Sequence, residues 1–137
     1  MIALGDFAGQ WQVARDIEDR KHDQTGRFEG VAMFTAVPSG LQYEERGTLR
    51  LGAGPDMQAT RRYHWSAEGD RIVVRFEDGR AFHNFLPGQA NEAAHWCDPD
   101  QYDVAYQFED WPTWTARWTV RGPNKDYGMS SLYTRPN

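Results

Sequence analysis

The sequence of 137 residues lacks several features that would define a protein class at once. It contains a single cysteine, Cys97, so an intramolecular disulfide is excluded and a reducing compartment is favoured. No run of about 18 apolar residues is present, so no transmembrane helix is expected. The segment Met1–Asp6 lacks the basic residues and the longer apolar core of a signal peptide. Together these features predict a cytoplasmic protein.

Basic residues are outnumbered by acidic residues and form no cluster. The chain has 15 lysines and arginines against 20 aspartates and glutamates, which gives a formal net charge of −5. Nucleic acids and anionic membranes are bound by basic patches, so we expect neither as a partner. The sequence also lacks G-x-S-x-G, P-loop and Rossmann fingerprints, internal repeats and interdomain linkers. Residues 1–137 are therefore expected to form one domain.

Aromatic residues and turn-forming residues are abundant by contrast. Six Trp, six Tyr and seven Phe favour strands and are typical of walls around ligand cavities. Glycine and proline, with aspartate and asparagine, recur at nine places where they should interrupt strands. These nine turn signals are at residues 26, 37–40, 52–55, 68–70, 78–79, 86–88, 98–100, 110–112 and 122–124.

Nine interruptions predict about ten short strands joined in sequence order as an antiparallel meander. Only Ile2–Ala8 is expected to be helical, as one short turn. A flat sheet of this size would expose two edges, and closure into a barrel removes them. The sequence therefore predicts an all-β fold, an antiparallel up-and-down barrel in which the last strand meets the first.

The first strand shows how residues divide between the two faces of this barrel. Trp11, Val13, Arg15 and Ile17 alternate with polar residues, the period of two expected of a strand with one buried face. One member of the buried series is an arginine, which is costly to bury without a partner. Arg15 thus predicts a polar group inside the barrel.

The turn at Asp78-Gly79 predicts which way the first lumenal histidine points. A two-residue hairpin loop there pairs Phe76 with Ala81 and Val74 with His83. Directly opposed residues share a face, so His83 is expected in the lumen. A three-residue bulged turn would reverse this orientation.

A second hairpin, with its loop centred on residues 99–100, pairs Cys97 with Tyr102 and His95 with Val104. Because the face of Tyr102 is the apolar one, His95 and Cys97 are expected to point inward. In that position the cysteine behaves as a small buried hydrophobe rather than as a nucleophile.

The opposite assignment of faces, with Ala94 and Trp96 pointing into the lumen, remains an alternative prediction. His83, His95 and Cys97 have no recognised metal-ligand spacing, and we expect no metal. The two histidines are instead expected as hydrogen-bonded core residues, as ligand contacts or as proton-transfer groups.

The same alternation on the remaining strands places three arginines, one carboxylate and several tyrosines in the predicted lumen. Two interpretations of its charges stay open, a structural ion-pair network and an arginine clamp for the carboxylate of a ligand. Arg135 or Arg121 has a further option, a cation–π contact over the ring of Trp11. The residues that parity adds to the lumen are Arg15, Tyr43, Glu45, Arg61, Tyr63, Trp65, Tyr106, Tyr133 and Arg135, and Trp118 lies on the buried face of its strand.

The chain resembles the calycin superfamily, whose lipocalin members begin their first strand with G-x-W. More closely, it is similar to a family of uncharacterised bacterial calycin-like domains of unknown function. This resemblance implies a calycin-like barrel and leaves the activity open. It rests on Gly9-Gln10-Trp11 with Arg15, and on the motifs within residues 43–47, 62–65, 76–83, 95–102 and 122–127.

The function expected from these features is binding of a small molecule, a compact anionic or aromatic ligand, by a monomer or homodimer. Arg15, Arg61 and Glu45 would orient its charge, while His83 and His95 would supply hydrogen bonds. One alternative is an isomerase, cyclase or lyase that uses either histidine as acid–base. A haem-binding barrel is the third interpretation, although no cofactor is expected. The full predicted ligand site is Arg15, Tyr43, Glu45, Arg61, Tyr63, Trp65, His83, His95, Tyr106, Trp118, Tyr133 and Arg135.

Overall fold

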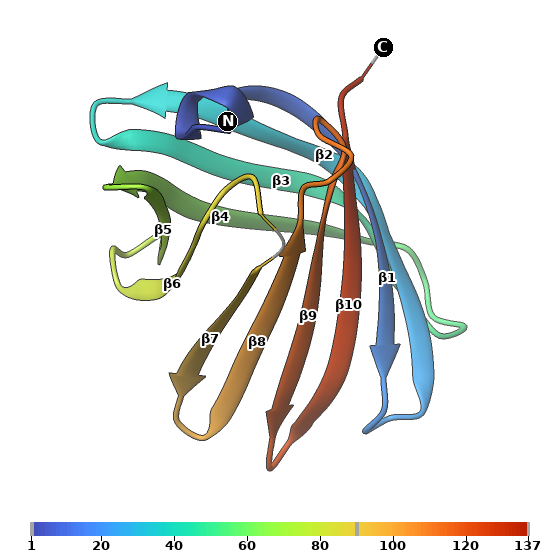
Figure 1. Ribbon diagram of the computed structural model, residues 1–137. Coiled ribbons are helices and arrows are strands. Elements are labelled where there is room, and N and C mark those ends of the chain that lie inside the picture. Colours follow the sequence, from blue (N-terminus) through green and yellow to red (C-terminus); the bar gives the residue numbers. More distant parts are fainter. Residues whose placement is uncertain (1, 90, 137) are drawn as a thin grey trace.

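The computed structural model describes residues 2–89 and 91–136, which form ten antiparallel strands in one sheet (Figure 1). The strand order is β6-β5-β4-β3-β2-β1-β10-β9-β8-β7, so each strand lies beside its sequence neighbours except at the ends of the list. The elements are η1 (Leu4–Phe7), β1 (Gly9–Asp19), β2 (Gln24–Val37), β3 (Gly40–Leu51), β4 (Met57–Glu68), β5 (Arg71–Phe76), β6 (Ala81–Phe85), β7 (Asn91–Cys97), β8 (Asp100–Gln107), β9 (Trp114–Gly122) and β10 (Lys125–Thr134).

The sheet curls into a nearly closed barrel, which confirms the predicted fold class. First and last strands pair as expected, from Gln12 opposite Thr134 to Asp19 opposite Tyr127. Closure is incomplete at a different place, because β6 and β7 are the two edges and no ladder joins them in the part of the chain that the structure describes. The Asn91 side chain instead binds the backbone N–H and C=O of Leu86, which ties the start of β7 to the end of β6.

One end of the barrel is sealed by η1 and by the start of β1. Phe7 and Trp11 are fully buried, and the indole Nε1 of Trp11 donates a hydrogen bond to the Phe7 carbonyl at 2.8 Å. Hairpin loops at residues 20–23, 52–56, 77–80, 98–99 and 123–124 surround the opposite end, called here the open end. No described helix has the length and apolar character needed to cross a membrane.

Arg135 lies outside the lumen, so its predicted place in the ligand site is wrong. Its guanidinium lies 3.7 Å from the centroid of Trp11 and donates to the carbonyls of Gln10 and Asp6. The cation–π alternative is therefore confirmed for this arginine. Arg135 follows the last residue of β10 and lies at the sealed end beside Trp11, so it does not line the lumenal cavity.

The turn expected at Gly26 is also wrong, since β1 and β2 are joined by residues 20–23 and Gly26 lies inside β2. It stands opposite Ile17 on β1 and Leu51 on β3. A Cβ at this position would meet the Leu51 side chain at 2.6 Å and the Arg50 carbonyl oxygen at 2.8 Å. Glycine is required here by close strand approach rather than by a turn.

His83 pairs with Val74 as predicted and is buried in the lumen. The predicted pair of Phe76 with Ala81 is wrong, because a register shift after Val74 places Arg75 opposite Ala81. The loop is consequently longer than two residues. The shift lies on the loop side of His83, so the orientation of the histidine is retained.

The predicted pairs on β7 and β8 are wrong by two residues. His95 stands opposite Tyr102 instead of Val104, and Cys97 stands opposite Asp100. The loop contains only residues 98 and 99, so its centre falls closer to β7 than expected. A shift by an even number of residues keeps every side chain on its predicted face.

The faces of β7 consequently follow the preferred prediction for His95. Its half-buried ring lies 5.3 Å from the centroid of Phe82, whereas Ala94 is exposed and Trp96 is 60% exposed. The alternative with Ala94 and Trp96 in the lumen is therefore wrong. Cys97 is exposed, which contradicts its expected burial, because it is the last residue of β7 at the open end.

Candidate functional site

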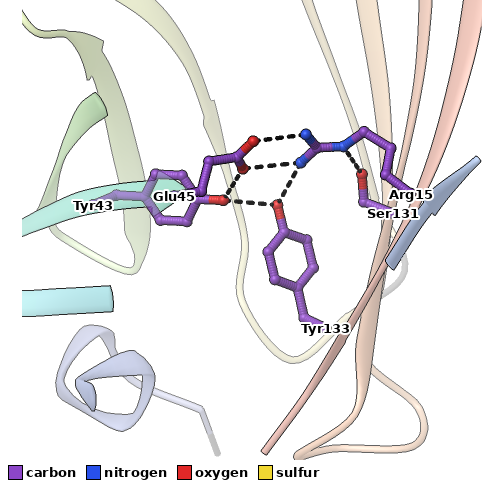
Figure 2. Close-up of polar contacts among 5 residues, drawn as sticks. All are labelled: Arg15, Tyr43, Glu45, Ser131 and Tyr133. Carbon is purple, nitrogen blue, oxygen red and sulfur yellow. Dashed lines mark hydrogen bonds and ion pairs between the residues drawn. The ribbon is translucent and has the colours of Figure 1, made fainter. Parts of the chain in front are cut away.

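An arginine–glutamate pair crosses the lumen between β1 and β3 (Figure 2). Arg15 Nη1 donates to Glu45 Oε2 at 2.7 Å, and Arg15 Nη2 donates to Glu45 Oε1 at 2.9 Å. The residues are 5% and 2% exposed, so the pair is removed from solvent on both sides. Two parallel N–H···O bonds between planar groups give the strongest geometry available to a buried ion pair.

The remaining donors and acceptors of the pair are also engaged. Arg15 Nε donates to Ser131 Oγ at 2.7 Å, and Arg15 Nη2 reaches the Tyr133 hydroxyl at 3.4 Å. The Tyr43 hydroxyl donates to Glu45 and lies 3.1 Å from the Tyr133 hydroxyl. Figure 2 shows these five side chains as one connected network. Buried polar groups satisfied in this way fix a single arrangement of the lumen.

Electrostatics keep both members of the pair charged. Burial acts to lower the pKa of Arg15, but the bound carboxylate of Glu45 outweighs it and the pKa is raised. Burial acts to raise the pKa of Glu45, and the hydrogen bonds and charge of Arg15 outweigh it, so this pKa is lowered. The counter-charge of Arg15 is therefore Glu45, a residue of the protein itself, as in the ion-pair interpretation of the sequence.

A cavity of about 40 Å³ lies beside this network in the lumen. It brings together ten of the predicted ligand-site residues and leaves out His95 and Arg135. Sequence reasoning missed four lining residues, although the alternation on β9 already put Trp114 and Ala116 on one face with Trp118. The lining residues are Arg15, Tyr43, Glu45, Arg61, Tyr63, Trp65, Val74, Phe82, His83, Tyr106, Trp114, Ala116, Trp118 and Tyr133.

Two buried ring nitrogens at this cavity have no hydrogen-bond partner among the described residues. They are His83 Nδ1 and Trp114 Nε1. The other nitrogen of the histidine, Nε2, lies 2.7 Å from the Tyr106 hydroxyl. The indole of Trp114 stacks on Tyr133 with ring centroids 3.8 Å apart, so its N–H has a fixed direction. Buried polar atoms of this kind are uncommon and cost stability unless something pairs with them.

His83 is neutral under ordinary conditions. Burial lowers its pKa to about 3, with a smaller contribution from the charge of His95. Burial likewise holds the pKa of Tyr106 well above its usual value, so this hydroxyl stays protonated. The cavity therefore offers neutral donors and acceptors beside a compensated ion pair.

The side of the cavity toward the open end is half-exposed. Tyr63 on β4 and Trp118 on β9 are half-buried there, and Arg61 is exposed. His95 lies behind Phe82 and Phe76, with ring centroids 5.3 and 5.9 Å away, and does not line the cavity. No group of three or more His, Cys, Asp or Glu residues in the described chain is arranged to hold a metal ion.

Larger hollows lie on the outer face of the sheet. Two of them have volumes of about 660 and 560 Å³ and are lined by outward-facing residues such as Asp16, Arg27 and Arg117. The charged groups that line them reach solvent, so these hollows present no buried atom in need of a partner. The lumen is therefore the stronger candidate site.

Comparisons with known proteins agree with this barrel. A family described as a family of unknown function (DUF6314) matches residues 7–135. The chain belongs to this family. No curated protein matches it. The predicted place of the chain in the calycin superfamily stays a prediction.

Among solved structures, the S-type phycobiliprotein lyase CPES from Guillardia theta is similar with a TM-score of 0.64 and 9% identity. That match covers 98% of this chain and 90% of the lyase. A redesigned β-barrel, mFAP1, bound to DFHBI, has a TM-score of 0.45 and 15% identity, with 97% of this chain and 98% of the other covered. At 9% identity, the likeness to the lyase concerns the fold alone.

Proposed function

We propose that this protein binds a compact small molecule in its lumen, beside His83 and Trp114. The observation that carries the proposal is the pair of buried ring nitrogens, one on each residue, that find no partner in the described protein. A ligand that accepts a hydrogen bond from the Trp114 indole and pairs with His83 Nδ1 would recover the cost of both, about 1–3 kcal/mol each.

The enclosed space limits the size of this ligand. A volume of about 40 Å³ accommodates little more than a water, whereas drug-sized ligands occupy roughly 300–1,000 Å³. A single-ring compound must therefore displace side chains at the open end, where Tyr63 and Trp118 are half-buried. Between β6 and β7, the two edges of the sheet, no ladder joins the described residues, so this part of the wall separates without loss of ladder hydrogen bonds.

The aromatic lining favours a planar ligand. Trp65, Trp118, Tyr63 and Phe82 surround the cavity together with the ion-pair network. Aromatic faces stack on planar rings, while the satisfied polar network below them fixes a rigid floor. We place this binding role in the cytoplasm, since a single exposed cysteine suits a reducing compartment.

A ligand screen on matched tryptophan variants tests the proposal. Thermal shift measurements with single-ring compounds should identify ligands that stabilise the protein, by about 2.7 kcal/mol at a concentration of 100 times Kd. Trp114→Phe keeps an aromatic ring and removes the indole N–H, so it should weaken binding of these ligands. Trp111→Phe, a change outside the cavity, should bind them as the unmodified protein does.

Isothermal titration calorimetry on the strongest compounds then separates binding from general stabilisation. Native mass spectrometry of protein purified without denaturant adds an independent readout, because a retained ligand appears as added mass. The proposal is contradicted if no compound binds, or if Trp114→Phe binds every compound as tightly as the unmodified protein.

A further inference from the structure

Arg61 holds an unusual position at the side of the cavity toward the open end. It lies on β4 directly opposite Glu45 on β3, the one carboxylate of the cavity lining. That carboxylate is bound on both oxygens by Arg15. Within residues 2–89 and 91–136, no carboxylate lies at ion-pair distance from Arg61, although this arginine lines the same cavity. The cavity thus has one guanidinium bound to a carboxylate at its base and, among the described residues, one guanidinium without an ion-pair contact near its opening.

Two other cations at the open end, Arg20 and Lys125, are paired with carboxylates. Arg20 binds Asp126 at 2.9 Å, and Lys125 lies 3.1 Å from a carboxylate oxygen of Asp100. At a distance beyond an ion pair, the charge of Arg61 contributes to lowering the pKa of Glu45. The same charge also acts across the lumen. Burial raises the pKa of Tyr127 on β10, and the positive charge of Arg61 opposes this rise.

Two aromatic side chains, Tyr63 and Trp118, line the same cavity as Arg61. Tyr63 is the next residue on the same face of β4, and Trp118 lines the cavity from β9. Both are half-buried, so they combine contact with a ligand and access from solvent. A guanidinium fork beside aromatic rings matches a planar group that carries a carboxylate, because the fork donates to both carboxylate oxygens and the rings stack on the plane.

We infer that the ligand class is a single-ring aromatic carboxylate, with its carboxylate on Arg61 and its ring against Tyr63 and Trp118. This inference rests on the proposed lumenal binding function and adds the chemistry of the ligand to it. A monoanion fits better than a phosphate dianion, because one free guanidinium faces it and the charged carboxylate of Glu45 lies in the same cavity.

Calorimetric titration with benzoate and with neutral benzamide tests the inference at neutral pH. The two probes have nearly the same shape, and their affinity ratio isolates the anion contribution. The unmodified protein should bind benzoate about tenfold or more tightly than benzamide. Arg61→Gln should abolish that preference, and Arg61→Lys should retain part of it because lysine keeps the charge without the fork.

Arg117→Gln is the matched control. Arg117 is exposed on the outer face of β9 and, in the described ranges, has no ion-pair partner, yet it does not line the lumenal cavity. This variant should keep the full preference for benzoate. The inference is overturned if benzoate does not bind, if benzamide binds as tightly, or if Arg61→Gln keeps the preference.

The same titrations distinguish failure of the inference from failure of the proposed function. Equal binding of benzoate and benzamide that weakens in Trp114→Phe overturns the carboxylate assignment and leaves lumenal binding supported. Absence of binding by both probes, together with an empty thermal-shift screen, overturns both proposals.

Discussion

The neutral His83 predicts that the folded protein loses stability as the pH falls below neutrality. Burial lowers the pKa of this histidine to about 3, whereas the unfolded chain restores an ordinary value of about 6.5. Between these values the unfolded state binds one more proton than the folded state. Stability is therefore fully present above pH 6.5 and decreases as the pH falls toward 3.

The expected loss follows from linkage. Each pH unit between the two pKa values costs about 1.4 kcal/mol, which gives about 2.5 kcal/mol between pH 7 and pH 4.5. Most of this window lies above the range in which Glu45 loses its own contribution, because that loss begins as the pH approaches the ordinary glutamate pKa of 4.5. An effect of this size is a large fraction of the total stability of a small domain.

Urea unfolding across this window, followed by tryptophan fluorescence, measures the loss. His83→Gln keeps a hydrogen-bond donor for Tyr106 and cannot be protonated, so its stability should change far less with pH. His64→Gln is the control, because His64 lies outside the lumen against Ser39 and its loss should leave the pH dependence unchanged. The reasoning is refuted if the unmodified protein changes by less than about 0.5 kcal/mol, or if His83→Gln keeps the full dependence.

Three further substitutions test the packing of the lumen and of the sealed end, each by urea unfolding at neutral pH. Glu45→Gln leaves Arg15 charged and unpaired, so it should lower the free energy of unfolding by about 3–5 kcal/mol. Adding Arg15→Met should recover much of this loss, and no recovery would argue against an ion-pair origin. Arg135→Gln loses one cation–π contact and two hydrogen bonds and should cost about 1–2 kcal/mol, while an unchanged midpoint would contradict a sealing role. Gly47→Ala places a Cβ 2.3 Å from the Glu29 carbonyl oxygen and should cost about 1–3 kcal/mol or more; neutral stability would mean that the strands separate freely there.

The sequence predicted the lumen well wherever a residue lies within a regular strand. Alternation alone assigned Arg15, Glu45 and Tyr133 to the interior, and all three line the cavity. Residues at the ends of the barrel were predicted less well, since Cys97 at the end of β7 is exposed and Arg135 beyond the end of β10 lies over Trp11 and does not line the cavity. Alternation assigns a face to each residue of a strand and does not say how far along the strand that face is enclosed.

Contacts across the barrel were harder to predict than faces. Pairing of adjacent strands puts Arg61 directly opposite Glu45, yet the carboxylate binds Arg15, which is two strands away. On the intervening strand β2, Gly30 stands opposite Gly47 of β3, and an added Cβ at these two glycines would meet backbone atoms at 2.2 and 2.3 Å. Such close strand approach depends on the three-dimensional course of the sheet, which residue alternation does not contain.

The size of the cavity in the lumen could not be predicted from the sequence either. Aromatic composition indicated a ligand cavity, but the same rings also fill space, as the stacking of Trp114 on Tyr133 at 3.8 Å illustrates. Whether such side chains surround a cavity or occupy it depends on their rotamers. The absence of a ladder between β6 and β7 in the described residues could not be predicted either, since nothing in their alternation marks them as the edges of the sheet.

The most direct test of lumenal binding is the two-dimensional ¹H–¹⁵N spectrum of the tryptophan indoles during titration with benzoate. The Trp114 resonance, assigned by its absence in Trp114→Phe, reports the buried N–H that has no partner among the described residues. We predict that this resonance shifts progressively and saturates, while that of the exposed Trp96 stays in place. An unmoved Trp114 resonance, under benzoate and under any compound that stabilises the protein, would contradict binding in the lumen.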